Sequence, residues 1–109
     1  MPYNEEIDSR IQKIVCRWKG TSYRKMFGGV CHLLQGNMLC GVYKDFLILR
    51  LGTENAYHAL QLPFVKVFDI TGKPMKGWVM VERRGFKTEK ELREWLKMAK
   101  EFVKSLSPK

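Results

Sequence analysis

The chain has few of the residues that build catalytic and metal centres. Its 109 residues include two histidines, and its three cysteines form no Cys-x-x-Cys pair. An odd number of cysteines without paired spacing favours neither a disulfide framework nor a structural zinc site. Acidic residues are also scarce, at 11 against 20 lysines and arginines. We therefore expect reduced thiols, no metal, no cofactor and no enzyme activity, since catalysis needs a nucleophile with a base, two tuned carboxylates or a metal.

Long apolar runs are lacking as well. No uninterrupted stretch reaches the roughly 20 residues that span a bilayer, and residues 1–10 hold three acids where a secretory signal has its apolar core. We therefore expect no membrane association and a cytoplasmic location. The content of 45% hydrophobic and 28% charged residues is typical of a globular protein. We predict a single domain over residues 1–106, followed by a frayed tail at 107–109.

Positive charge is in excess, and it is unevenly distributed. The formal net charge is +9. Residues 1–50 hold eight basic and four acidic side chains, residues 51–82 hold three of each, and residues 83–109 hold nine basic and four acidic ones. Nucleic acid, acidic proteins and anionic surfaces are therefore all possible partners. The excess is largest in the C-terminal quarter of the chain.

Three stretches have the features of helices. Apolar residues recur at helical spacing over residues 4–18 and again over 88–106. The second of these begins with a capping box, in which Thr88 is followed three residues later by Glu91. A shorter helix is predicted over residues 53–62, ending before a proline.

Between the helices, runs typical of strands alternate with turn signals. Residues 26–51 predict three antiparallel strands joined by tight turns at Gly36-Asn37 and Lys44-Asp45, and residues 64–69 and 78–82 predict a further hairpin. The element order is then α-β-β-β-α-β-β-α. This order predicts an α+β fold, a two-layer sandwich in which helices cover one face of an antiparallel five-stranded sheet.

Both faces of this predicted sheet are apolar. The face on which we place the helices holds Cys31, Leu33, Met38, Cys40, Val42, Leu47 and Leu49. Trp18 and Trp95 would anchor two of the helices there, and His32 would point to the opposite face. That opposite face would expose an apolar patch, formed by Leu34, Leu39, Tyr43, Phe46 and Ile48. Two explanations stay open: a helix or a different register covers this patch, or it is the interface for a protein partner or a homodimer.

Basic residues repeat at spacings of three and four along the last predicted helix. They are Lys90, Arg93, Lys97, Lys100 and Lys104. This spacing places them along one side of the helix, where they are candidate contacts for nucleic acid or another anion. Glu89 and Glu101 stand four residues from Arg93 and Lys97, so ion pairs would partly neutralise the stripe. A solvated face and a weak, non-specific nucleic-acid site both stay open.

Three stretches carry a family resemblance. KMFGGV at residues 25–30, MLCGVYKD at 38–45 and FDITGKPMKGW at 68–78 resemble the signature stretches of the TfoX/Sxy N-terminal domain family. The resemblance covers nearly the whole chain. It implies a small α+β fold similar in outline to secretion chaperones, and no catalytic residues. The best-known members regulate natural competence in bacteria and carry an additional C-terminal helical domain, whereas here we expect a stand-alone N-terminal domain.

Composition and resemblance together predict a non-enzymatic bacterial regulatory or interaction module. The alternative is a non-specific nucleic-acid-binding protein that uses the basic side of the last helix.

Overall fold

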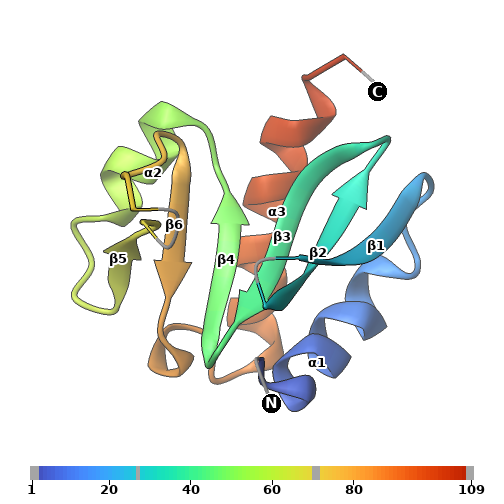
Figure 1. The fold of residues 1–109 in the computed structure, drawn as a ribbon, viewed down its shortest axis with the longest axis horizontal. Helices are drawn as coiled ribbons and strands as arrows, with labels where there is room; N and C mark the ends of the chain where they lie inside the picture. The colour runs from blue at the N-terminus through green and yellow to red at the C-terminus, as the bar shows by residue number, and fades with distance from the viewer. Residues whose placement is uncertain (1–2, 27, 70–71, 108–109) are drawn as a thin grey trace.

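The computed structural model describes residues 3–26, 28–69 and 72–107, which form helices packed on one antiparallel sheet (Figure 1). The helices are α1 (Glu5–Val15), α2 (Thr53–Ala59) and α3 (Glu89–Lys104), with a one-turn 3-10 helix, η1 (Arg83–Gly85), before α3. The strands are β1 (Thr21–Met26), β2 (Gly29–Leu34), β3 (Asn37–Tyr43), β4 (Phe46–Arg50), β5 (Val65–Val67) and β6 (Trp78–Val81). Their order across the sheet is β1-β2-β3-β4-β6-β5.

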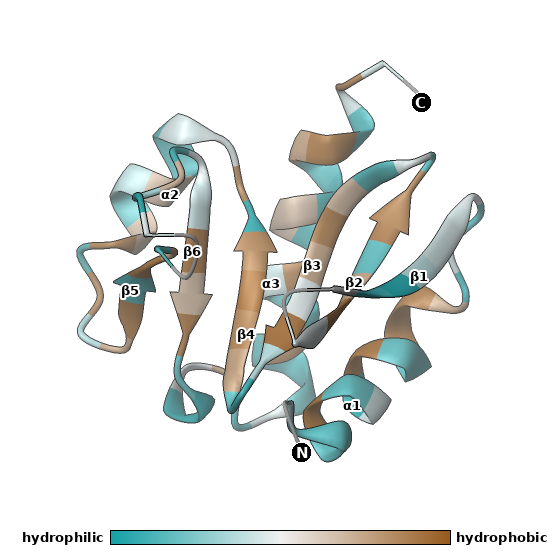
Figure 2. Ribbon diagram, viewed as in Figure 1, coloured by the Kyte–Doolittle hydropathy of each residue, from teal (hydrophilic) through white to brown (hydrophobic). Residues whose placement is uncertain are grey.

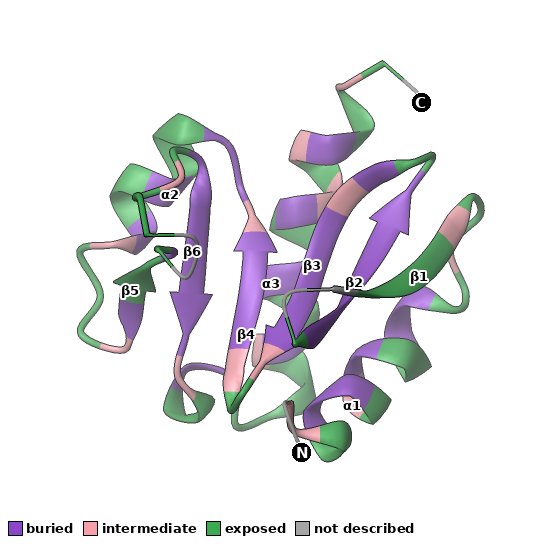
Figure 3. Cartoon of the chain, in the orientation of Figure 1, coloured by how far each residue is buried: buried purple, intermediate pink, exposed green. Residues whose placement is uncertain are grey.

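The α+β class, the antiparallel sheet and the three helices confirm the prediction, but the sheet has six strands and not five. The additional strand, β1, pairs with β2 at one edge of the sheet. Its sequence, TSYRKM, contains no apolar alternation, and Figures 2 and 3 show it largely hydrophilic and exposed. An edge strand needs no buried face, and charged side chains protect it from pairing with other chains. The hydrophobic pattern therefore did not reveal it.

Local capping explains where the two long helices begin. The side chain of Asn4 accepts hydrogen bonds from the backbone N–H groups of Glu6 and Ile7 at the start of α1. At the start of α3, the predicted capping box is confirmed: Thr88 and Glu91 each bond the other's backbone N–H. Such caps satisfy N–H groups that have no partner within the helix, and each contributes about 1 kcal/mol.

The main core lies between the helices and one face of the sheet. α3 packs across β2, β3 and β4, α1 lies beside it against β3, and α2 packs against β6 (Figure 1). Fully buried side chains come from both layers, such as Ile11 of α1, Leu92 and Leu96 of α3, and Leu47 and Leu49 of β4. Figure 3 shows the four inner strands buried along most of their length. The helices are thereby fixed relative to one another through the sheet.

A bulge in β3 changes the predicted faces of the sheet. The first turn is at Gln35-Gly36, with φ values of 52° and 83°, one residue before the predicted position. The register between β2 and β3 then shifts between His32 and Leu33. The pairing leaves Leu39 as the extra residue, because Leu33 lies opposite Met38 whereas His32 lies opposite Cys40. An extra residue reverses which side chains share a face.

The predicted faces therefore need correction. Cys40, Val42, Leu47 and Leu49 do face the helices, but Cys31, Leu33 and Met38 lie on the other side of the sheet. Conversely, Leu34 and Leu39 belong to the core under the helices, where they are 5% and 0% exposed. Their placement on the second face was wrong.

The second face is itself covered. Ile48 is 5% exposed and packs with Phe68, Trp78 and Met80 in a separate apolar cluster. Tyr43, Phe46, Met38 and Met75 are partly buried against this cluster. Phe68 and Met75 come from the segment between β5 and β6, so a part of the chain itself covers residues that were predicted to be exposed. Of the predicted patch, Tyr43 and Phe46 alone keep a substantial exposed area.

The end of the chain is attached to the sheet at Ser107. The backbone oxygen of Ser107 accepts a hydrogen bond of 2.8 Å from the side-chain amide of the buried Asn37. Residues 108–109 of the predicted tail lie outside the described residues, as do residue 27 of the first resembling stretch and residues 70–71 of the third.

Within the described ranges, each helix is too short or too polar to cross a membrane.

Candidate functional site: a basic groove between α1 and α3

Trp18 lies in the turn that leads from α1 to β1. Its backbone N–H donates to the oxygen of Val15, and the Thr21 hydroxyl lies 3.3 Å from the backbone oxygens of both Val15 and Trp18. Gly20 completes the turn with a φ of 80°, which favours glycine. The indole ring is half-buried and packs against the edge of the core. The turn and the core thus hold this ring in a defined position at the surface.

The two predicted anchor tryptophans differ in their environments. Trp95 is 9% exposed, and its indole N–H donates to the backbone oxygen of Gly85 over 2.9 Å, as expected of a buried anchor. Trp18 instead lines a groove at the protein surface. Of the two predicted anchors, Trp95 is thus buried, whereas Trp18 packs against the core only in part and also lines the groove.

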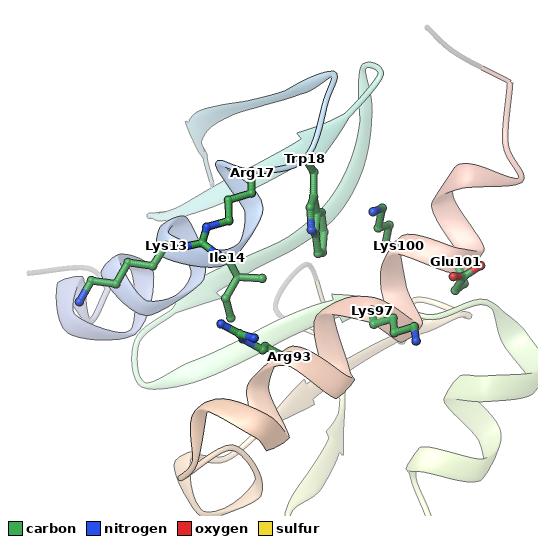
Figure 4. Close-up of a pocket in the computed structure, with 8 residues that line it drawn as sticks. All are labelled: Lys13, Ile14, Arg17, Trp18, Arg93, Lys97, Lys100 and Glu101. Atoms are coloured by element: carbon green, nitrogen blue, oxygen red, sulfur yellow. The ribbon is translucent and has the colours of Figure 1, made fainter.

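The groove lies between α1 and α3 and has a volume of about 310 Å³ (Figure 4). Ile14 and Trp18 provide its apolar part. Five cationic side chains surround them, from both helices and the turn after α1: Lys13, Arg17, Arg93, Lys97 and Lys100. Glu101 is the one acidic residue among those that line it. The groove therefore combines a flat aromatic ring with an excess of positive charge.

Some residues of the predicted basic stripe on α3 line the groove, and the others lie beside it. Arg93, Lys97 and Lys100 line the groove itself. Lys90 lines an adjoining depression of about 300 Å³, in which two acids, Glu89 and Glu94, also take part. Lys104 lies one turn beyond Lys100 and is exposed.

Ion pairs neutralise less of this charge than the sequence predicts. Arg93 does pair with Glu89, at 3.4 Å, but no pair joins Lys97 to Glu101 within 4.0 Å. Over the part of the chain that the structure describes, no salt bridge engages Lys13, Arg17, Lys97 or Lys100. Lys100 instead places its Nζ atom 4.5 Å from the centre of the Trp18 ring, a cation–π contact. Most of the positive charge in the groove is thus free to meet an anion.

A second basic depression, of about 400 Å³, is different because its three arginines already have partners. It is lined by Glu6, Arg10, Arg83, Arg84 and Lys87. Arg10 donates to the backbone oxygens of Phe86, Lys87 and Thr88, at 2.7, 3.2 and 3.4 Å. Arg83 pairs with Glu6 and Arg84 with Glu82, at 2.9 and 3.2 Å. These arginines connect η1 to its neighbours, so the groove between α1 and α3 is the stronger candidate site.

A buried pair of polar side chains holds α1 against the sheet. Nε2 of His32 on β2 lies 2.7 Å from Oδ1 of Asp8 on α1, and Gln12 donates to the other oxygen of Asp8. His32 and Asp8 are 2% and 7% exposed. This pair positions the helix that forms one side of the groove, and its burial excludes substrate from the histidine.

The two buried cysteines have thiols of low reactivity. Cys40 lies opposite His32 in the sheet, on the same face, which corrects the predicted placement of His32. Burial raises the pKa of the Cys40 thiol far above its usual range. Burial also raises the pKa of Cys31 to about 11, although the nearby Arg24 lowers it. Among the described residues, no three His, Cys, Asp or Glu side chains are grouped so that they could hold a metal ion.

The half of the groove on the α1 side was missed at the level of sequence. Lys13 and Arg17 stand four residues apart, the spacing of neighbours on one helix face, and Arg17 directly precedes Trp18. This pairing of cations with an aromatic residue was the available signal. The helical spacing of apolar residues predicts a core position for Trp18, and this does not group it with Lys13 and Arg17.

Comparison with known proteins places most of the chain in one family. The model of the TfoX N-terminal domain family matches residues 13–103. The matched range contains every residue that lines the groove. No curated protein and no solved structure gives a significant match to the chain.

Proposed function

Because the chain belongs to the TfoX N-terminal domain family, we propose that it is a non-catalytic regulatory module, like the domain found in competence regulators, which acts in the bacterial cytoplasm by binding a partner. Its binding surface is the groove between α1 and α3, and the partner is anionic.

The uncompensated charge of the groove carries this proposal. Four of its five cations have no salt bridge in the described structure, and they come from segments far apart in sequence, such as Arg17 after α1 and Lys97 on α3. Bringing like charges together costs free energy, which an anionic ligand would recover. The groove is also concave and half apolar, so a ligand gains contact area beyond ion pairing.

The inaccessibility of the His32–Asp8 pair and of the Cys40 thiol supports a non-catalytic role. His32 and Asp8 form a buried hydrogen-bonded pair, and neither is accessible to a substrate. Cys40, the thiol opposite His32, is 1% exposed, and its raised pKa keeps it protonated at neutral pH. An enzyme needs its nucleophile and base to face the substrate.

The second sheet face is the weaker candidate for a partner or homodimer interface. Cations already lie over both of its partly exposed rings: Lys44 Nζ is 5.4 Å from the Tyr43 ring centre, and Lys66 Nζ is 5.7 Å from that of Phe46. A protein interface would have to displace these lysines and would gain little buried apolar area.

Binding of inorganic polyphosphate, measured by calorimetry over a range of salt concentrations, tests the proposal. With five phosphate contacts, the affinity is expected to fall roughly 100-fold between about 50 and 200 mM salt. Lys97→Glu should weaken binding about tenfold at low salt and lower the slope of the salt dependence by about 1. Lys76→Glu is the matched control, because it makes the same charge change in the exposed part of the segment between β5 and β6. Equal effects of the two substitutions, or no binding by the wild type, would contradict the proposal.

A further inference from the structure

The position of Trp18 is not explained by charge alone. A groove that only collected anions would need cations and polar groups, yet its centre is an indole ring that is held by the turn after α1 and left half-exposed. Exposing part of a large aromatic side chain among cations costs hydrophobic free energy. A flat ligand that covers the ring would recover this cost.

We propose that the anionic partner is a single-stranded nucleic acid, one base of which stacks on Trp18 while the surrounding cations contact the neighbouring phosphates. This inference rests on the proposed function of the groove, and it names the class of ligand.

The arrangement of cations matches a short length of strand. Arg93, Lys97 and Lys100 follow one side of α3 over seven residues, which is about 10 Å at a rise of 1.5 Å per residue. At the spacing of about 3.4 Å per nucleotide of a stacked strand, this distance corresponds to about three nucleotides. In Figure 4, Lys13, Arg17 and Arg93 lie on one side of Trp18, and Lys97 and Lys100 lie on the other, so phosphates on both sides of a stacked base would find a cation.

The contact of Lys100 with Trp18 fits the same ligand. Its Nζ atom lies 4.5 Å from the ring centre and carries the charge over the aromatic surface. The lysine side chain is long and flexible, so it can move aside to contact a phosphate when a base covers the ring. Proteins that bind single strands without sequence preference combine these two features, a positively charged groove and an aromatic ring on which bases stack.

Other anions would use only part of the groove. A duplex keeps its bases stacked inside and presents phosphates, so it would leave Trp18 uncovered. An acidic peptide offers carboxylates to the lysines, but it carries no obligatory flat ring for the indole. The described residues that line the groove include no asparagine, glutamine, serine or threonine, and in the proposed arrangement its cations contact phosphates rather than base edges. We therefore expect binding that depends little on base sequence.

Fluorescence anisotropy tests the inference. A labelled oligothymidylate is bound at low salt, and duplex DNA, polyphosphate and polyglutamate of equal charge compete with it. The single strand should bind best. Trp18→Leu keeps an apolar side chain at the edge of the core but removes the ring, and it should weaken oligothymidylate binding about tenfold and polyphosphate binding much less. Trp18→Phe, which keeps a ring, should retain most of the affinity.

Quenching of tryptophan fluorescence supplies a second measurement that does not require the leucine variant to fold. The other two tryptophans, Trp78 and Trp95, are 8% and 9% exposed, so Trp18 is the ring that a base can reach. Oligothymidylate should quench the wild type, and the quenching should disappear in Trp18→Phe although the oligonucleotide still binds.

Two results overturn the inference without contradicting the proposed function. One is equal affinity for oligothymidylate and polyphosphate, with both affinities lowered by Lys97→Glu, which contradicts base stacking and leaves the anion-binding groove in place. The other is quenching that persists in Trp18→Phe, which places the base elsewhere. If Lys97→Glu changes the affinity for none of the polyanions, both this inference and the proposed function are contradicted.

Discussion

Removal of the Asp8 carboxylate should destabilise the fold more than its small size suggests. In Asp8→Ala, Nε2 of His32 loses a hydrogen bond of 2.7 Å, and the imidazole, 2% exposed, stays buried without that partner. An unsatisfied buried polar group costs about 1–3 kcal/mol, a large share of the 5–15 kcal/mol that stabilises a typical domain. For a chain of this length, the expected fall in the midpoint of thermal unfolding is about 4–12 °C.

Urea denaturation measures this cost, and a double-mutant cycle isolates the pair. Gln12→Ala is the matched control: it removes the outer hydrogen bond to Asp8 from an exposed position and should cost no more than about 1 kcal/mol. The double variant Asp8→Ala/His32→Leu should be less destabilised than the sum of the single variants predicts, because His32→Leu removes the imidazole that Asp8→Ala leaves without a partner. If Asp8→Ala unfolds at the wild-type urea midpoint, or if the two effects add, the pair does not hold α1 as described.

Three further predictions concern other parts of the fold. Trp95→Phe should cost about 1–3 kcal/mol in urea denaturation, since it leaves a buried backbone oxygen in η1 without its donor; an unchanged midpoint would mean that water replaces the indole. In the native protein, an alkylating reagent at neutral pH should modify the exposed Cys16 and leave Cys31 and Cys40 intact, because burial raises both of their pKa values and blocks access; a mass spectrum with a second label would refute this. The pKa of Glu91 is lowered first by its hydrogen bonds with Thr88, so its stabilising effect is complete above the ordinary glutamate pKa and is lost as the pH falls through the lower folded-state value. Thermal unfolding of Glu91→Gln should accordingly depend less on pH than that of the wild type below about pH 4.3, and identical profiles would contradict the capping role.

The helix caps were predictable because all the interacting atoms lie within one turn. Asn4 bonds to residues two and three positions along the chain, and Thr88 bonds to Glu91. No other part of the fold is needed to form such contacts, so their sequence pattern is sufficient. The same holds for the hairpin turn at Lys44-Asp45, which aligns Tyr43 with Phe46 as predicted.

The faces of the sheet were less predictable because they depend on pairing across strands. Moving the first turn by one residue and adding Leu39 as a bulge placed Leu34 and Leu39 under the helices, although the local sequence is equally apolar on both faces. Alternation shows which residues of one strand share a face, but it does not show which face meets the core when both are hydrophobic. For this reason Leu34 and Leu39 were wrongly predicted to lie in the exposed patch.

The candidate site shows the same division between local and tertiary information. The spacing of Arg93, Lys97 and Lys100 by itself determines that they share one side of α3, because helical periodicity is a local property. The packing of α1 beside α3 determines that this side faces Lys13, Arg17 and Trp18, which are more than 70 residues away in sequence. Helix packing depends on the buried faces, and the positions of the charged faces are a consequence of that packing. Sequence alone therefore predicted a basic stripe, and the tertiary structure made it one wall of a groove with an aromatic ring at its centre.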